Sequence, residues 1–285
     1  MRYLTLLPLL PLLHAAESRY ANLDGLKVHY ENHGQGRKAV LFIHGWTCDL
    51  TFWRLQTPAV AARHRVVLVD LPGHGLSDKP ENVSYSLPLF ARAVGAVLRD
   101  AGVEQAVLVG HSMGVPVSRQ VIRMYGEKIA GFVAVDGFFR RTPSSPEELE
   151  KATAQWNEFV KRYRGPDYKD QAARAIDSMF GPATSDAVRQ EIKSKMLSAP
   201  RHVMFSAMEG MGDWTYNAPD RIAVPTLAIF AKRPALTADA EQYARTFIPN
   251  LDWQVWEGVN HFLMMEKPEE FNRVLLEFLA AKTAP

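Results

Sequence analysis

The sequence predicts an α/β fold in which a mostly parallel central sheet is covered by helices on both faces. Short apolar runs alternate with segments of helical periodicity along most of the chain, which is the pattern of repeated strand and helix units. The 285 residues, of which 47% are hydrophobic, can bury one large core. Strand signals are missing from residues 138–214. We therefore expect one α/β core, formed by residues 17–137 and 215–285, with an insertion between its two parts.

Six apolar runs are the expected parallel strands, because strands that are buried on both faces are continuously apolar. These runs cover residues 38–44, 65–70, 105–110, 131–136, 225–231 and 253–257. Residues 20–30 come before them and are expected to form an antiparallel hairpin at the sheet edge. Helices are expected at residues 87–100, 113–125 and 238–247, and from Pro268 onward.

The insertion at residues 138–214 follows the expected strand at residues 131–136, which is the sixth when the two strands of the hairpin are counted, and is predicted to be helical. Its first helix is well marked, with Ser145 as the N-cap and Pro146 in the first turn. An insertion at this point should lie over the carboxyl ends of the strands, where open α/β sheets bind ligands. We therefore expect a lid. Its large apolar side chains either line a pocket for an acyl chain or fill the lid's own core: Met196, Met204, Phe205, Met208, Met211 and Trp214.

The first 16 residues differ from the rest of the chain. Arg2 is followed by a leucine-rich run with two prolines, and the run ends at Ala15 and Ala16. This is typical of a secretory signal peptide, and the run is too short to span a bilayer as a helix. A membrane-associated N-terminal tail is the alternative. The signal peptide predicts a periplasmic or secreted protein, and no other segment of the sequence is predicted to span a membrane.

The charge balance and the single cysteine limit the expected partners. The chain has 33 Lys and Arg residues against 31 Asp and Glu residues, which is not the basic pattern of a nucleic-acid binder. A small and roughly neutral substrate is expected. Cys48 is the only cysteine, so the chain can form neither an internal disulfide nor a cysteine metal cluster. We expect Cys48 to serve packing, and no metal or organic cofactor is predicted.

Ser112 is the predicted nucleophile. It lies in Gly110-His111-Ser112-Met113-Gly114, directly after an apolar strand and directly before a helical segment. The pentapeptide alone is only suggestive, but a sharp turn between a strand and a helix forces the serine hydroxyl out at the carboxyl end of the sheet. The context therefore predicts nucleophilic chemistry at Ser112.

A serine hydroxyl needs a base to take its proton and donors to hold the oxyanion that forms. His261 lies between the last strand and the last helix, where a loop can bring it to the same sheet edge as Ser112. It is the predicted base. The backbone amides of Met113 and Trp46 are the predicted oxyanion donors, and Gly45 allows the backbone to approach closely.

These motifs resemble, in their order along the chain, those of lid-bearing α/β-hydrolase fold enzymes of the esterase and lipase type. The resemblance is carried by residues 44–46, 70–78, 110–114 and 258–262. It implies a serine hydrolase, because haloalkane dehalogenases and epoxide hydrolases of this fold carry aspartate at the position of Ser112. The carboxylates in the 70–78 loop are expected to be structural, since loop aspartates commonly cap turns.

The third member of the triad departs from the usual pattern of that family. In most relatives the acid follows the strand expected here at residues 225–230, but Pro234 occupies the corresponding position. A second location is known in the family, after the preceding strand, and Asp136 fills it. We predict Asp136 as the acid that orients His261. Asp239 and then Asp213 are the alternatives, and Asp136 could also be an ordinary turn residue before a glycine.

The predicted function is hydrolysis of carboxylic esters through an acyl-enzyme intermediate. The same triad would also serve a lactonase, an amidase, a C–C bond hydrolase or a perhydrolase, because all of them transfer an acyl group. A binding protein that uses the same fold without catalysis is the alternative from another class.

Overall fold

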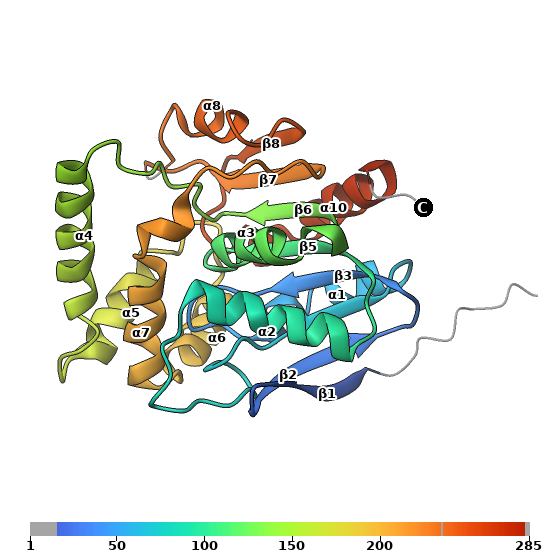
Figure 1. Ribbon diagram of the computed structural model, residues 1–285, viewed down its shortest axis with the longest axis horizontal. Helices are drawn as coiled ribbons and strands as arrows, with labels where there is room; N and C mark the ends of the chain where they lie inside the picture. The colour runs from blue at the N-terminus through green and yellow to red at the C-terminus, as the bar shows by residue number, and fades with distance from the viewer. Residues whose placement is uncertain (1–15, 235, 283–285) are drawn as a thin grey trace, which may run out of the picture.

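An eight-stranded sheet forms the centre of the protein. The computed structural model describes residues 16–234 and 236–282. The strands lie side by side in the order β1-β2-β4-β3-β5-β6-β7-β8. All of them except β2 run in one direction (Figure 1). Their bounds are β1 (Glu17–Leu23), β2 (Leu26–His33), β3 (Lys38–Ile43), β4 (Val66–Val69), β5 (Gln105–His111), β6 (Ile129–Val135), β7 (Thr226–Ala231) and β8 (Leu251–Trp256).

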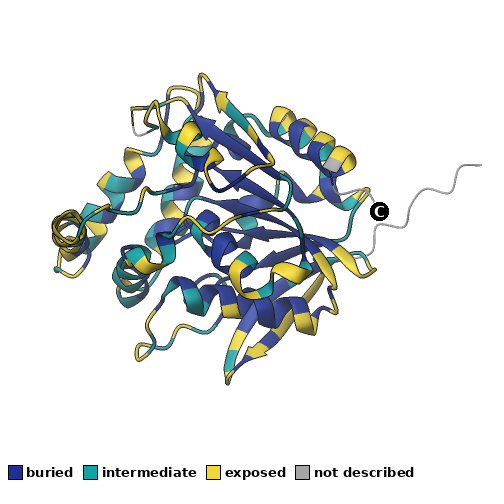
Figure 2. Ribbon diagram, turned by 45° about the horizontal axis from the view of Figure 1, so that its top comes forward, coloured by how far each residue is buried: buried dark blue, intermediate teal, exposed yellow. Residues whose placement is uncertain are grey.

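The central strands are buried on both faces, as their continuous apolar sequences predict. Every residue of β4 and of β7 is buried, and the middle of the sheet is dark blue in Figure 2. The first two strands form the predicted antiparallel hairpin. Asp24 and Gly25 connect them, with φ angles of 52° and 94°, the left-handed conformations that a two-residue hairpin turn requires.

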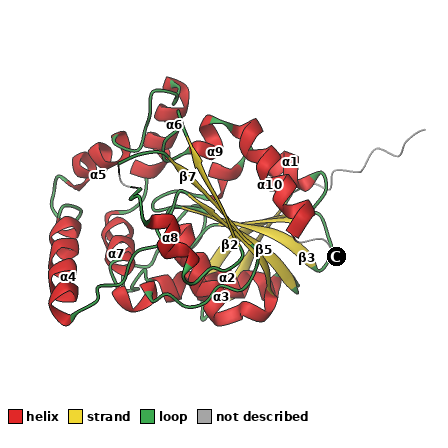
Figure 3. Cartoon of the chain, turned by 90° about the horizontal axis from the view of Figure 1, so that it is seen from above, coloured by secondary structure: helices red, strands yellow, loops and turns green. Residues whose placement is uncertain are grey.

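Helices cover both faces of the sheet, which confirms the predicted fold class (Figure 3). On one face lie α2 (Leu87–Asp100) and α3 (Gly114–Tyr125), and on the other lie α1 (Thr57–Ala61) and α10 (Pro268–Lys282). The remaining short helices of the core are η1 (Leu50–Trp53), η2 (Gly126–Lys128), η3 (Trp214–Asn217), α8 (Ala240–Arg245) and α9 (Leu263–Glu266).

Four helices form the insertion between β6 and β7: α4 (Pro146–Lys161), α5 (Tyr168–Asp177), α6 (Asp186–Leu197) and α7 (Arg201–Met211). They lie at the end of the sheet to which the arrowheads of the parallel strands point (Figure 1). The N-cap of α4 is the predicted one, because the Ser145 hydroxyl accepts a hydrogen bond from the Glu148 amide. The Glu148 carboxylate in turn accepts from the Ser144 amide, at 2.9 Å.

Some predicted boundaries were wrong by a few residues. Strand β8 begins at Leu251 rather than at residue 253. Asp252 is exposed there, because an edge strand pairs on one side only, and so the apolar signal is interrupted. Helix α8 ends at Arg245, before the predicted residue 247, and Pro249 follows, which cannot continue a helix.

The predicted signal peptide falls almost entirely on residues 1–15, which lie outside the described part of the chain. Within the described residues, no helix has both the length and the apolar character needed to cross a bilayer.

Candidate active site

Ser112 lies in a sharp turn between β5 and α3. Its φ angle is +54°, a left-handed conformation that is uncommon for a residue other than glycine. Close packing of the backbone holds this turn. A Cβ atom at Gly110 would lie 2.4 Å from the Gly114 carbonyl oxygen, and one at Gly114 would lie 2.4 Å from the Ile43 carbonyl oxygen. Both glycines are therefore required by the space around the turn, and Ser112 remains partly exposed at its tip.

The structure brings Ser112, His261 and Asp136 together in a hydrogen-bonded line. The Ser112 Oγ atom is 2.9 Å from His261 Nε2, and His261 Nδ1 is 2.6 Å from Asp136 Oδ2. In the neutral imidazole that this line requires, Nδ1–H donates to the carboxylate and Nε2 accepts from the serine hydroxyl. His261 and Asp136 are buried. The geometry is that of a nucleophile, a base and an orienting acid.

The alternative acids lie elsewhere. Asp239 is exposed and forms an ion pair with Arg141 at 2.8 Å. Asp213 caps the short helix η3, where its carboxylate accepts from the Thr215 amide. Neither of them contacts His261, so Asp136 is the carboxylate that the structure places at the base.

Asp136 also has a partner that the sequence interpretation missed. Its Oδ1 atom accepts from the Ala231 amide at 3.0 Å, and its Oδ2 atom accepts from Arg233 Nη2 at 2.5 Å. Burial alone would raise the pKa of Asp136, but the hydrogen bond and charge of His261 and the charge of Arg233 lower it below its usual value. The carboxyl group is therefore ionised at neutral pH. Arg233 directly precedes Pro234, in the loop where the resemblance led us to look for the acid.

The oxyanion donors predicted from the sequence flank the nucleophile. Met113 follows Ser112, and Trp46 follows β3 in the adjacent turn. In the described parts of the chain, no acceptor is hydrogen-bonded to the backbone amide of either residue. The Trp46 indole donates to the Met204 carbonyl of α7 at 2.9 Å, which ties this turn to the insertion. Two free amides beside a serine hydroxyl are suited to bind a developing oxyanion.

Gly45 brings the Trp46 turn close to the nucleophile. A Cβ atom at Gly45 would lie 3.1 Å from Ser112 Cβ and 3.2 Å from His111 Nδ1. We expect Gly45→Ala to lower kcat for ester substrates by about 10- to 100-fold, because the turn and the serine must separate. Gly126→Ala is the matched control, since a Cβ atom there meets nothing within 4 Å. Equal kcat values for the two variants would contradict this view of the turn.

His111 holds the backbone of the base. Its Nε2 atom donates to the His261 carbonyl oxygen at 2.8 Å, and the centroids of the two rings are 4.7 Å apart. Burial, followed by the charge of His261, lowers the pKa of His111 to about 3. His111 is therefore neutral at pH 7 and is a positioning residue for His261.

Buried neutral histidines make the stability of the protein sensitive to acid. Burial also lowers the pKa of His74 to about 3. Because the unfolded chain takes up these protons near the ordinary histidine pKa of about 6.5, the free energy of unfolding should fall as the pH decreases from about 6.5 toward 3. We expect each of the two histidines to contribute on the order of 1 kcal/mol per pH unit. Urea denaturation between pH 7 and pH 4.5 measures the slope, and His111→Gln should reduce it. An unchanged slope in that variant would contradict the prediction.

A cavity of about 310 Å³ opens at the triad. Ser112 and His261 line it together with Trp46 and Met113, whose amides are the predicted oxyanion donors. Eight of the residues that line it belong to the insertion: Phe138, Arg140, Trp156, Phe159, Ser178, Met179, Met208 and Met211. Of the methionines that we singled out, Met208 and Met211 line this cavity. Met196, Met204 and also Met208 are buried in the core. The packing interpretation is confirmed for Met196 and Met204, and the acyl chain stays a prediction.

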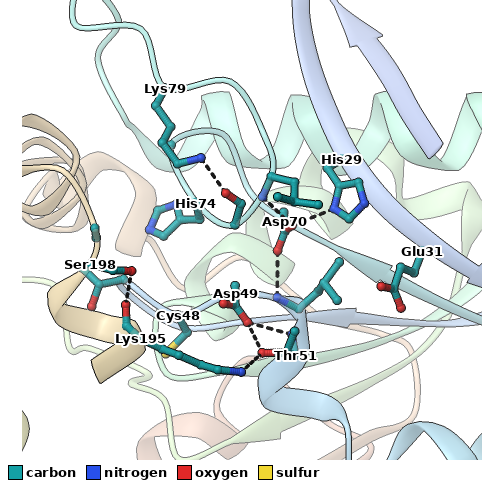
Figure 4. A pocket seen from close by; sticks show the side chains of 16 residues that line it. His29, Glu31, Cys48, Asp49, Thr51, Asp70, His74, Lys79, Lys195 and Ser198 are labelled. Carbon is teal, nitrogen blue, oxygen red and sulfur yellow. Dashed lines mark hydrogen bonds and ion pairs between the residues drawn. The ribbon is translucent and has the colours of Figure 1, made fainter. Parts of the chain in front are cut away.

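A second pocket, of about 370 Å³, surrounds the 70–78 loop (Figure 4). At its centre the Asp70 carboxylate accepts from His29 Nδ1 at 2.7 Å and from the amides of Leu50 and Leu76. Asp70 thus joins β2 to the loops that follow β3 and β4, a structural role.

Cys48 also lines this pocket, and burial raises the pKa of its thiol well above the usual value. Among the described residues, no group of three or more His, Cys, Asp or Glu side chains could hold a metal ion.

Comparisons with known proteins identify the family to which the chain is similar. A family model described as the alpha/beta hydrolase family matches residues 40–274. Over 274 residues the chain is 40% identical to the dihydrolipoyllysine-residue acetyltransferase component of the acetoin cleaving system of Cupriavidus necator, covering 93% of this chain and 70% of that protein. It is 28% identical to the pimeloyl-[acyl-carrier protein] methyl ester esterase of Aeromonas hydrophila subsp. hydrophila, covering 89% and 100% of the two chains.

A solved structure extends the likeness to three dimensions. The thermophilic esterase from Thermogutta terrifontis superposes with a TM-score of 0.78 at 26% sequence identity, covering 94% of this chain and 98% of that one. The similar proteins also include hydrolases of other substrates, among them epoxides. With the family match, the sheet topology and the strand–turn–helix geometry at Ser112 in agreement, the chain belongs to the alpha/beta hydrolase family.

Proposed function

We propose that this protein is a serine hydrolase that cleaves carboxylic esters through an acyl-enzyme intermediate. The observation that carries the proposal is the pair of hydrogen bonds joining Ser112 Oγ to His261 Nε2 and His261 Nδ1 to Asp136 Oδ2. A hydroxyl within 2.9 Å of an oriented imidazole can lose its proton as it attacks a carbonyl carbon.

The acylation step follows from this arrangement. Ser112 Oγ bonds to the carbonyl carbon of the ester while its proton moves to His261 Nε2. The amides of Trp46 and Met113 donate to the oxyanion, and each such donor contributes about 3 kcal/mol to the stability of the transition state. Asp136 stabilises the imidazolium cation that forms. The bond from carbon to the alkoxy oxygen then breaks, and the alcohol leaves with the proton from His261.

Deacylation repeats the same steps with water. His261 takes a proton from a water molecule as the water oxygen attacks the acyl carbon. The tetrahedral intermediate collapses, the bond to Ser112 Oγ breaks, and the serine recovers its proton from His261. One ester and one water therefore yield one carboxylic acid and one alcohol.

Three observations support an ester as the substrate. Ser112 occupies the elbow, where the resemblance assigns aspartate to the epoxide hydrolases. Two of the similar proteins reported above are named as esterases, and the cavity beside Ser112 has the size of a small-molecule site.

The roles of the insertion and of the N-terminus belong to the same proposal. We assign residues 138–214 to a lid, since eight of their side chains line the cavity at Ser112. We assign residues 1–16 to a signal peptide on their sequence alone, which would make the mature protein periplasmic or secreted. Mass spectrometry of the protein recovered from a periplasmic or culture fraction would test the export, with the expectation that the leucine-rich run has been removed.

Two measurements on the purified protein test the proposed chemistry. The protein should hydrolyse short- and medium-chain p-nitrophenyl esters, and a fluorophosphonate probe should label it stoichiometrically at Ser112. Inertness toward the esters together with absence of labelling would contradict the proposal. Stoichiometric labelling without turnover of esters or lactones would favour a binding protein that uses the same fold.

A further inference from the structure

Arg140 is a cation in the active-site cavity that the catalytic steps do not use. It follows β6 by five residues and lines the same cavity as Ser112 and His261. Burial lowers the pKa of Arg140 to about 10, so that the guanidinium keeps its charge at neutral pH. The cavity therefore contains a positive charge in addition to the triad.

Aromatic rings hold the guanidinium in place. Its central carbon lies 4.0 Å from the centroid of the Trp156 ring, 5.7 Å from that of Trp214 and 5.8 Å from that of Phe138. The Trp156 ring is itself fixed, because its indole donates to the Met208 carbonyl at 2.9 Å. Stacking of this kind occupies the faces of a guanidinium and leaves the N–H groups at its edge available for hydrogen bonds.

The N–H groups of the Arg140 guanidinium make almost no hydrogen bonds within the protein. Its one hydrogen bond in the described parts of the chain runs from Nη1 to the Met211 carbonyl at 3.4 Å, near the upper limit for such a bond. No carboxylate among the described residues lies within ion-pair distance of Arg140. The other arginine in the cavity, Arg233, is already paired with Asp136. A partly buried cation with unused N–H donors and no protein counter-charge is suited to bind an anion.

We propose that Arg140 anchors an anionic group of the substrate, so that the enzyme prefers esters that carry a carboxylate several bonds away from the scissile carbonyl. The proposal rests on the proposed ester hydrolysis and adds the substrate class to it. A planar carboxylate matches the edge of a guanidinium, which can donate two parallel N–H bonds to it. The proposal departs from the roughly neutral substrate expected from the overall charge balance: the reacting end of the proposed substrate is neutral, and its distant end is an anion.

Paired substrates test the preference directly. Monomethyl esters of linear C6, C7 and C8 dicarboxylic acids carry the anion on the acyl side, and methyl hexanoate, heptanoate and octanoate are their neutral counterparts. In a second arm, 6-acetoxyhexanoate carries the anion on the alcohol side, with hexyl acetate as its counterpart. In one of the two arms, the wild-type kcat/KM should be about 10- to 100-fold higher for the anionic ester, the range expected for charged hydrogen bonds.

The variant Arg140→Met removes the charge and keeps an apolar side chain against Trp156. It should lose the 10- to 100-fold preference while kcat/KM for the neutral ester stays within about threefold of the wild-type value. Arg141→Met is the matched control: this neighbouring arginine is exposed and pairs with Asp239, and its removal should leave the preference unchanged.

Binding measurements separate this proposal from the proposed function. In a Ser112→Ala background, calorimetry with monomethyl adipate and with 6-acetoxyhexanoate should give, for at least one of the two ligands, a Kd that is about 10- to 100-fold weaker after Arg140→Met. If the wild-type protein hydrolyses no ester but this difference in Kd is found, the proposed function fails and the anion anchor stands. Equal kcat/KM for anionic and neutral esters in both arms would overturn the anchor. An Arg140→Met variant that loses activity equally on both substrate types, with unchanged Kd in the Ser112→Ala background, would overturn it as well.

Discussion

Replacement of Ser112 by alanine is expected to lower kcat for ester hydrolysis by about 10⁴- to 10⁶-fold, because the variant lacks the atom that forms the acyl-enzyme. The fold should be retained, since alanine has the same steric preference as serine at the φ angle of +54°. Initial rates with p-nitrophenyl butyrate give kcat, and thermal unfolding reports on the fold.

Ser198→Ala provides the control for Ser112→Ala. Ser198 is exposed at the end of α6, and its hydroxyl donates only to the Lys195 carbonyl. Its removal should change kcat by less than about threefold. Substantial ester hydrolysis by a Ser112→Ala variant that is folded would mean that another group attacks the ester.

Replacement of Asp136 by asparagine is expected to lower kcat by about 10⁴-fold. Asparagine has the same shape as aspartate, but its neutral side chain neither fixes the His261 tautomer nor stabilises the imidazolium cation. The substitution also leaves the Arg233 guanidinium without its carboxylate, and so the folded state should lose stability. Steady-state kinetics and urea denaturation at pH 7 measure the two effects separately.

The loss of stability in Asp136→Asn should depend on pH in a defined direction. Because the pKa of Asp136 is lower in the folded protein than its usual value, the wild-type carboxylate stabilises the fold above about pH 4, and this contribution disappears as the pH falls through the folded-state pKa. The difference in stability between wild type and Asp136→Asn should therefore be largest at neutral pH and shrink in acid.

Asp239→Asn is the matched control for the acid. Asp239 is the carboxylate closest in sequence to the usual family position, but it is exposed and paired with Arg141. We expect its kcat to stay within about threefold of the wild-type value. Full activity in Asp136→Asn combined with inactivity in Asp239→Asn would assign the acid to the other residue.

The order of the elements could be predicted from the sequence because it depends on local patterns. Continuous apolar runs such as Val66–Val69 identify strands that are covered on both faces. The glycines around Ser112 identify the turn, since their close backbone contacts leave no room for a side chain. His261 and Asp136 were predicted for a related reason: each follows a parallel strand, and the carboxyl ends of parallel strands meet at one sheet edge.

The partners of individual side chains could not be predicted in the same way. Arg233 pairs with a carboxylate 97 positions earlier in the chain, and Arg140 stacks on rings that the insertion supplies. Such contacts depend on how the loops fold over the sheet, and they leave no periodicity in the sequence. The net charge averages over the whole surface, so it gave no sign of a guanidinium inside the cavity. Which methionines reach the cavity and which lie in the core depends on helix packing, which also leaves no periodicity in the sequence.

Trapping of the covalent intermediate tests the central claim most directly. The protein is mixed with p-nitrophenyl acetate, quenched in acid within milliseconds to seconds, and digested for mass spectrometry. We predict one acetyl group per protein during turnover, located on the peptide that contains Ser112 and lost when the substrate is exhausted. Steady turnover with no acylated protein at any time, or with the acetyl group on a different residue, would contradict nucleophilic catalysis by Ser112.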